Sequence, residues 1–340
     1  MDNKKLSKEN ILNKLNTADN VFDFVKYNLE YLVEYLQYAC EYFTQNCGFG
    51  ASEIFYENFR DLRRIAASKL LQQEHIYVMM AHPLMPLYTE ETGEFGITFA
   101  TTRKGAEILL EEQKKKGRRC FAAEINGKQN MRDYLRKSFF IDGYDHIVVW
   151  NSEMKTSFFL EDDLFKDNEK HRFKKYVSNN GLFSKVACYQ QTISAVFEGV
   201  PIDKEVFFQN EIKSFAAIMD AELIVPVEKN GKEPEVISDE NFVQRVPLKD
   251  FNRGDKEIKL FPVYTDLDTF LHSEYSLEDY SFYRVNIEDL LYLLPCEHIV
   301  INHSTIGLII QKDIVLEKIA AVKKFVNDFS DEKILAQFHQ

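Results

Sequence analysis

The strongest constraint on the fold is an internal repeat, because the same order of predicted strands and helices occurs twice along the chain. In each copy a short apolar run is followed by an alternating strand, a helix, a strand, a helix and a closing pair of strands. Each copy spans about 90 residues, which is far longer than a solenoid repeat and typical of a domain. The repeat therefore predicts two related modules in one chain.

The change from a helical to a strand-like hydrophobic period near residue 74 marks the start of the first copy. The predicted strands of this copy are 75–80, 95–101, 119–125, 146–150 and 157–160, and its predicted helices are 103–116 and 131–140. The second copy has predicted strands at 223–227, 259–265, 280–285, 298–301 and 306–310, and predicted helices at 266–274 and 287–294.

Two local sequence matches set the register between the copies. One match lies in the alternating strand and the other at the end of a later apolar strand. The paired segments are Ile97/Phe99/Thr101 with Phe261/Val263/Thr265, and Trp150-Asn151 with Ile301-Asn302. The expected fold class is α/β (or α+β): two homologous modules with mixed sheets and packed helices, plus an N-terminal helical hairpin. Right-handed crossovers should join the parallel strands.

Helical patterns flank and connect the two copies. Apolar residues recur at steps of three and four from Asp19, a predicted N-cap, to about Gln45, and a second stripe follows the Gly48-Phe49-Gly50 break. The resulting segments are a helical hairpin (1–72), module 1 (73–165), a helical connector (166–221), module 2 (222–312) and C-terminal helices (313–340).

Charge and cysteine usage exclude several classes of protein. The chain has 42 basic and 54 acidic residues, a net charge of −12, which disfavours general binding to nucleic acid or to an anionic membrane surface. Its five cysteines are widely spaced and form no CxxC pair, so neither a disulfide framework nor a thiolate zinc knuckle is indicated. The first twenty residues lack the apolar core of a secretory signal, and no run of about 18 apolar residues occurs. We expect a cytoplasmic protein that does not enter the membrane.

Motifs for the commonest catalytic and nucleotide sites are missing from the sequence. Gly48-Phe49-Gly50 follows a helix, where the dinucleotide motif needs a strand, and no Walker sequence or nucleophile elbow occurs. The segment from Cys296 to His303 is rich in metal-ligand types, but its spacing favours buried strand-end residues over a metal site. No catalytic residue, cofactor or metal is therefore predicted, and whether the protein is an enzyme stays open.

Polar residues at predicted strand ends are the first candidates for a binding site. Thr265 and Asp266 follow the alternating strand of module 2, and Asn302 and His303 follow its later apolar strand. Asn151 holds the matching place in module 1. These turns would contact a ligand or a partner, with helix capping by Asp266 as the alternative.

Two further surfaces are candidates. Lys114, Arg118 and Arg119 belong to a basic run at the end of a predicted helix, where they would bind an anion or simply form a solvated face that complements the helix dipole. Tyr27, Tyr31, Tyr35 and Tyr38 form a second stripe on the first long helix. Tyrosine is common at protein interfaces, so this stripe would either dock a partner or pack on module 1.

Part of the second copy resembles a known family. Pro262-Val263-Tyr264-Thr265-Asp266, an acidic helix start, and the apolar strand that ends at Asn302 are similar to the SseB (enhanced serine sensitivity protein B) N-terminal domain family. The resemblance covers residues 222–312 well and 74–161 more loosely, as in bacterial members with tandem copies. It implies a cytosolic α/β module without catalytic residues and with a regulatory or scaffolding role.

Two functions follow as expectations. The first is a non-enzymatic binding, adaptor or regulatory protein with an unknown protein partner, with self-association into a homo-oligomer also open. The alternative is a sensor or enzyme that binds a small anionic metabolite in a cleft between the modules, near Lys114, Arg118 and Arg119.

Overall fold

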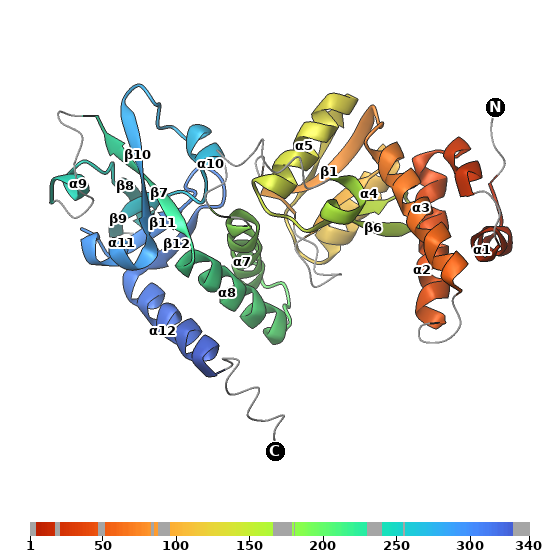
Figure 1. The fold of residues 1–340 in the computed structure, drawn as a ribbon. Helices are drawn as coiled ribbons and strands as arrows, with labels where there is room; N and C mark the ends of the chain where they lie inside the picture. The colour runs from red at the N-terminus through yellow and green to blue at the C-terminus, as the bar shows by residue number, and fades with distance from the viewer. Residues whose placement is uncertain are drawn as a thin grey trace, which may run out of the picture. The chain divides into compact units, whose positions relative to one another are not determined.

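The computed structural model describes residues 5–17, 21–46, 52–82, 85–87, 96–165, 179, 181–229, 240–253 and 256–328. The contacts divide the chain into two units, residues 1–140 with 144–171, and residues 141–143 with 172–340. Each unit contains β-sheet and packed helices (Figure 1), so the α/β fold class predicted from the sequence is confirmed.

Unit 1 begins with a group of helices that pack on one another. They are α1 (Lys8–Asn16), the 3₁₀ helix η1 (Val21–Lys26), α2 (Leu29–Gln45) and α3 (Glu53–Leu70). The side chains of Ser7, Asn28 and Ser52 accept hydrogen bonds from backbone N–H groups in the first turns of α1, α2 and α3. The prediction of a single helix from Asp19 to about Gln45 is wrong, because Asn28 caps a new helix, α2, after η1 has ended at Lys26. Asp19 itself lies outside the described residues.

The sheet of unit 1 is mixed. Its strands are β1 (His75–His82), β2 (Met85–Pro86), β3 (Gly96–Ala100), β4 (Phe121–Asn126), β5 (His146–Trp150) and β6 (Lys155–Phe159). Strand β1 pairs antiparallel with β2, β3 and β4, while β3 pairs parallel with β5, and β5 antiparallel with β6.

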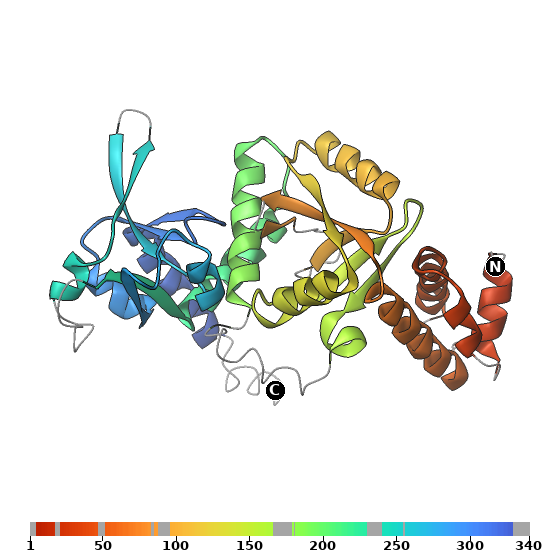
Figure 2. The same ribbon diagram turned by 90° about the horizontal axis from the view of Figure 1, so that it is seen from above.

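Two helices cover opposite faces of this sheet (Figure 2). Helix α4 (Arg103–Lys115) packs its Ala106 and Leu109 against Met79 and Ala100. Helix α5 (Lys128–Phe140) lies on the other face, where the Tyr134 ring meets Phe99 at 5.9 Å. Gly117, with φ +80°, ends the α4 segment as its place after the helix predicted.

A half-buried ion pair ties the N-terminal helices to the end of the sheet. Strand β6 leads into the π-helical turn η3 (Leu160–Leu164). There Asp163 accepts hydrogen bonds from Nε of Arg63, at 3.1 Å, and from its terminal nitrogen, at 2.5 Å. The Arg63 guanidinium also lies 5.9 Å from the Phe158 ring and 5.7 Å from the Phe159 ring, so α3 is fixed by charge and by aromatic contact together.

Unit 2 repeats the pairing scheme of unit 1. Its strands are β7 (Glu222–Glu228), β8 (Lys249–Arg253), β9 (Lys256–Val263), β10 (Tyr280–Asn286), β11 (His298–Ile301) and β12 (Leu308–Gln311). Strand β7 pairs antiparallel with β10 and bridges to the end of β9, β9 pairs parallel with β11, and β11 antiparallel with β12. Strand β8 adds a hairpin with β9 that the sequence reasoning did not predict.

The observed ladders change the predicted register between the copies by one residue. Phe99 pairs with Val149 in unit 1, and Val263 pairs with Ile301 in unit 2. With Phe99 matched to Val263, Val149 is the counterpart of Ile301, whereas the hairpins with β6 and β12 place Trp150 and Ile301 alike as the last paired residues of β5 and β11. The two predicted matches therefore differ by one residue. The match of Asn151 with Asn302 depends on a shared asparagine, whereas the ladders count residues across hydrogen bonds.

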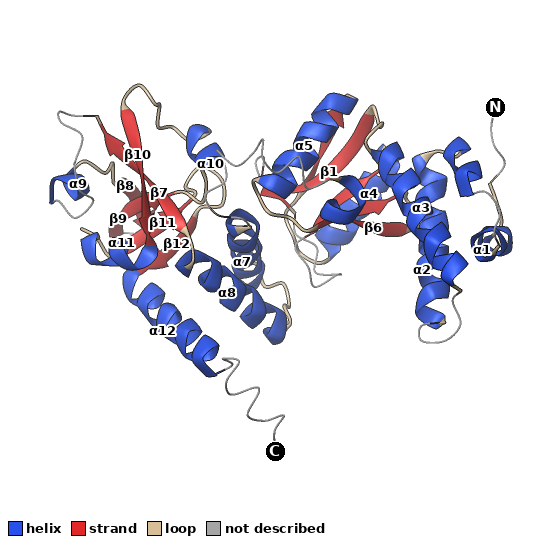
Figure 3. Cartoon of the chain, in the orientation of Figure 1, coloured by secondary structure: helices blue, strands red, loops and turns tan. Residues whose placement is uncertain are grey.

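Helices complete unit 2 (Figure 3). They are α7 (Leu182–Phe197), α8 (Lys204–Met219), α9 (Glu240–Gln244), α10 (Leu267–Leu271), α11 (Ile287–Leu293) and α12 (Lys312–Asp328). Of the 166–221 segment expected as a connector, residues 172–221 fall in this unit by contact, as does the C-terminal helix, and the N-terminal helices fall in unit 1. Helix α8 is joined to both neighbours through Glu211, which accepts from the Tyr189 hydroxyl of α7 and from Lys318 of α12, each at 2.9 Å.

Candidate functional site

The strand-end turn of unit 2 is a closed network of buried polar groups. Asp266 is the N-cap of α10 and accepts from the Thr269 backbone N–H at 2.7 Å. Its carboxylate also accepts from the hydroxyl of Thr265 at 2.6 Å and from that of Thr269 at 2.9 Å. The three side chains are between 1% and 4% exposed. Asp266 therefore does what the capping alternative expected, and no partner reaches its carboxylate from solvent in this structure.

Asn302 closes the same network from the next strand. Its amide oxygen accepts from the Thr265 N–H at 2.9 Å, and its amide nitrogen donates to the Thr265 hydroxyl at 2.8 Å. Its backbone is left-handed, with φ +50°, which asparagine tolerates better than most residues. Asn302 is fully buried, whereas His303 beside it is exposed and lies 4.0 Å from Glu274.

The matching turn of unit 1 is built from different residues. Thr102 caps α4 by accepting from the Gly105 N–H at 3.0 Å, and its hydroxyl lies 2.9 Å from that of Ser152. Asn151 is half-buried, accepts from the Met154 N–H at 2.7 Å, and donates to the carbonyl of Glu30 in α2 at 2.8 Å. Asn151 thus joins the sheet to α2, a role that Asn302 does not have.

The predicted basic residues lie where α4 ends. Lys114 and Arg119 are exposed and Arg118 is half-buried. The Arg118 N–H donates to the Gln113 carbonyl at 3.0 Å, so the chain turns back along the helix at this point. Their positions are as expected for cations that complement the C-terminus of a helix. The two residues before Lys114 line a pocket that is described below.

The tyrosine stripe of α2 mostly packs inside the N-terminal helices. Tyr27 and Tyr35 are buried, with ring centres 5.3 Å apart, and the Tyr35 hydroxyl accepts from the Leu6 N–H at 2.9 Å. Tyr31 and Tyr38 are half-buried, and the Tyr38 hydroxyl donates to Glu34 at 2.7 Å. Burial of Tyr35 raises the pKa of its hydroxyl to about 12. The stripe therefore offers a partner little more than the edges of Tyr31 and Tyr38.

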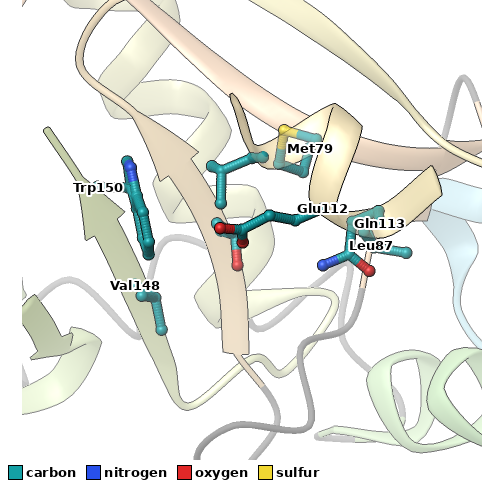
Figure 4. A pocket seen from close by; sticks show the side chains of 8 residues that line it. Met79, Leu87, Glu112, Gln113, Val148 and Trp150 are labelled. Carbon is teal, nitrogen blue, oxygen red and sulfur yellow. The ribbon is translucent and has the colours of Figure 1, made fainter. Parts of the chain in front are cut away.

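A pocket that the sequence reasoning did not find lies between α4 and the sheet of unit 1 (Figure 4). Strands β1, β3 and β5 supply its floor, and the last turn of α4 supplies its wall. It encloses about 20 Å³ and is lined by Met79, Leu87, Thr98, Leu109, Glu112, Gln113, Val148 and Trp150. A cavity of roughly 10–15 Å³ holds one water, so this space accepts a group of about that size.

Three polar atoms of the pocket lining are buried without a hydrogen-bond partner in the described part of the chain. They are the Thr98 hydroxyl oxygen, the Gln113 amide oxygen and the Trp150 indole nitrogen. Thr98 and Gln113 are 4% and 7% exposed. Buried polar atoms are nearly always paired, so three exceptions at one pocket single it out as a site.

Sequence alone gave little sign of this pocket. Thr98 is one polar residue in an apolar strand and Gln113 is one polar residue on the buried face of α4. These two departures from the hydrophobic pattern were the available signal. Trp150 ends a predicted apolar strand, which by itself indicates no site.

The segment rich in metal-ligand types has no ligand geometry. The Cys296 thiol donates to the His298 carbonyl at 3.3 Å, and burial raises the pKa of that thiol, which favours its protonated form. Across the residues described by the structure, no three His, Cys, Asp or Glu side chains are grouped to hold a metal ion. Over the same residues, no helix has the length and apolar character needed to span a bilayer.

The pocket between α4 and the sheet is thus the best candidate site, and only the residues that line it indicate what it could bind. Comparison with protein-family models, curated proteins and solved structures finds no match for this sequence.

Proposed function

We propose that the protein is a non-enzymatic binding or regulatory protein that holds a small polar ligand in the pocket between α4 and the sheet of unit 1. The observation that carries the proposal is that three of the residues lining that pocket, Thr98, Gln113 and Trp150, each have a buried polar atom without a partner in the described part of the chain.

The three unpartnered atoms of the pocket lining lose the hydrogen bonds that water makes with them in the unfolded chain. Each buried polar atom without a partner costs about 1–3 kcal/mol of stability. A ligand that pairs with these atoms recovers this cost on binding, so the site stores binding energy at the expense of the unliganded fold. Functional sites commonly carry such local costs.

A matched pair of threonine substitutions tests the proposal. Thr98→Val removes the pocket hydroxyl at nearly constant shape, so we expect a higher melting temperature and a loss of ligand-induced stabilisation. Thr156→Val is the control, because Thr156 lies on β6, is also buried with an unpartnered hydroxyl, and does not line the pocket. It should raise the melting temperature and leave ligand binding unchanged.

The measurement is a thermal-shift screen of the full chain with small polar metabolites, in which a ligand that binds the folded state raises the melting temperature. If no compound shifts the wild-type protein, the proposal fails. Equal ligand shifts in the wild type and in Thr98→Val would also place the ligand elsewhere.

A second candidate function, the adaptor role with a protein partner, is favoured by exposed apolar side chains. Val196, Phe197 and Phe208 are 49%, 85% and 57% exposed and lie near the turn that joins α7 and α8. Exposed aromatic residues are typical of binding surfaces. The double variant Phe197→Ser/Phe208→Ser should abolish a complex, or a homo-oligomer, that light scattering detects in the wild type. An unchanged mass would exclude this surface.

Family and compartment belong to the same proposal. The shared pairing scheme of the two units supports tandem SseB-like modules, although each strand-end turn is built differently. The described cysteines, Cys40, Cys120, Cys188 and Cys296, form no disulfide with one another, which supports a reducing compartment such as the cytoplasm.

A further inference from the structure

Glu112 sets the electrostatic character of the pocket. It is the one charged side chain among the eight lining residues, and it is half-buried. In Figure 4 its carboxylate is seen between the Trp150 ring and the Gln113 amide. A carboxylate in this position accepts hydrogen bonds and repels an anion at short range.

The neighbouring groups fit a donor in the ligand. The Thr98 hydroxyl oxygen and the Gln113 amide oxygen are both unpartnered in the described part of the chain, and both accept hydrogen bonds. Trp150 adds an indole ring, which is the aromatic group that attracts cations most strongly, while its unpartnered N–H is a donor that an ammonium group does not satisfy. Together with Glu112, the pocket offers a carboxylate, two acceptor oxygens and a π-face.

The backbone at the end of α4 also favours a cation in the pocket. Glu112 and Gln113 lie in the last turn of α4, where the carbonyl groups of a helix end give a partial negative charge. Lys114 and Lys115 in this turn, and Lys116 after it, oppose that field, but all three are exposed, and water and salt screen exposed charges over about 8–10 Å. The groups that line the pocket therefore decide which charge it accepts.

Size and the apolar lining restrict the ligand further. The enclosed 20 Å³ holds a group about as large as one water molecule, and an ammonium group is of that size. Met79, Leu87, Leu109 and Val148 offer only hydrocarbon surface. Because the ammonium group fills the enclosed volume, a short aliphatic chain attached to it would extend out of that volume past these apolar side chains.

From this juxtaposition we infer that the pocket of unit 1 recognises a primary ammonium group on a short aliphatic body, with Glu112 as its counter-ion and Trp150 as its aromatic wall. This inference rests on the proposed ligand site and adds the chemical class of the ligand. It differs from the anionic metabolite that the basic run at 114–119 predicts.

The experiment uses Trp150 as its reporter, because it is the single tryptophan of the chain. The full-length protein is titrated with three probes of equal size and different charge: n-propylamine as its cation, propan-1-ol, and propionate. Tryptophan-selective fluorescence and the melting temperature are recorded for each. We expect propylamine alone to change the emission and to raise the melting temperature.

Two charge-neutralising variants assign the effect. Glu112→Gln should weaken propylamine binding by about tenfold to a hundredfold, the range for a hydrogen bond to a charged group. Glu111→Gln is the matched control, because Glu111 precedes Glu112 on α4, is exposed and does not line the pocket. It loses the same net charge and should bind propylamine as the wild type does.

The possible results distinguish a wrong ligand class from the absence of a ligand site. If propan-1-ol or propionate binds in place of propylamine, the ligand class is wrong while the pocket stands as a ligand site. If Glu112→Gln and Glu111→Gln weaken propylamine binding equally, the effect is one of general charge and the inference is wrong. If no probe and no compound of the wider screen has an effect, the ligand site itself is refuted.

Discussion

Replacing Asp266 by alanine gives the sharpest test of whether the strand-end turn of unit 2 is structural or functional. The structure predicts a large loss of stability, because the carboxylate is 1% exposed and accepts from one backbone N–H and two threonine hydroxyls. A binding role, as the sequence suggested, predicts a loss of partner affinity with little change in stability.

The magnitude follows from the groups left unpaired. Loss of the N-cap of α10 costs about 1 kcal/mol. The hydroxyls of Thr265 and Thr269 each lose a charged acceptor, worth about 1.5 kcal/mol or more per bond. Removing a buried carboxylate also relieves its desolvation cost, so about 4 kcal/mol is an upper value and 2–4 kcal/mol is expected. For a unit of this size that corresponds to a fall of roughly 5–15 °C in melting temperature.

Differential scanning calorimetry with circular dichroism measures this fall. Thr102→Ala is the matched control in unit 1, where a neutral hydroxyl caps α4 and its loss costs about 1 kcal/mol. Asp266→Asn keeps a capping oxygen and should fall between the wild type and Asp266→Ala. A melting temperature of Asp266→Ala equal to that of the wild type would refute the structural reasoning and would return Asp266 to the list of binding residues.

Three further predictions concern other contacts. Asp163→Ala leaves the half-buried guanidinium of Arg63 unpaired and should cost up to about 3–5 kcal/mol, the range for a fully buried pair, in chemical denaturation; a loss below about 1 kcal/mol would show a solvated pair. Burial raises the pKa of Tyr35 from 10.0 to about 12, so its contribution to stability is complete below pH 10 and is lost as pH rises to about 12; Tyr35→Phe should flatten the stability profile in that window, and an unchanged profile would contradict this. Gly143→Ala directs a methyl group, at φ +75°, into the backbone of Gly181 and should lower the melting temperature, whereas an unchanged value would show that this approach relaxes freely.

Much of the local structure could be predicted from the sequence. The 3.6-residue period of α4, α5, α7, α8 and α12 and the strand-like period of β1, β3 and β5 are visible as apolar patterns, because each element buries one face or both. The ends of these elements follow from capping groups such as Gly117. The short helix α9 and strand β8 were missed, because five residues carry too few periods to show a pattern.

The candidate site could not be found in the same way. Polar residues at strand ends often bind ligands, which made Asp266 and Asn302 candidates, yet both side chains bond to Thr265 within the fold. Conversely, Thr98 and Gln113 were passed over, because one polar residue on a buried face usually finds an internal partner. Sequence order does not show which buried polar atoms are paired.

The sequence by itself determined where most of the strands and helices form, their repeated order and the caps that begin and end several of them, since these depend on neighbours within one or two turns. Only the tertiary structure decided which polar groups satisfy one another. Four elements, β1, β3, α4 and β5, must come together before Thr98, Gln113 and Trp150 can share one pocket. Hydrogen bonds and pockets form between residues that are distant in sequence, so their pairing depends on the packed sheet and its register.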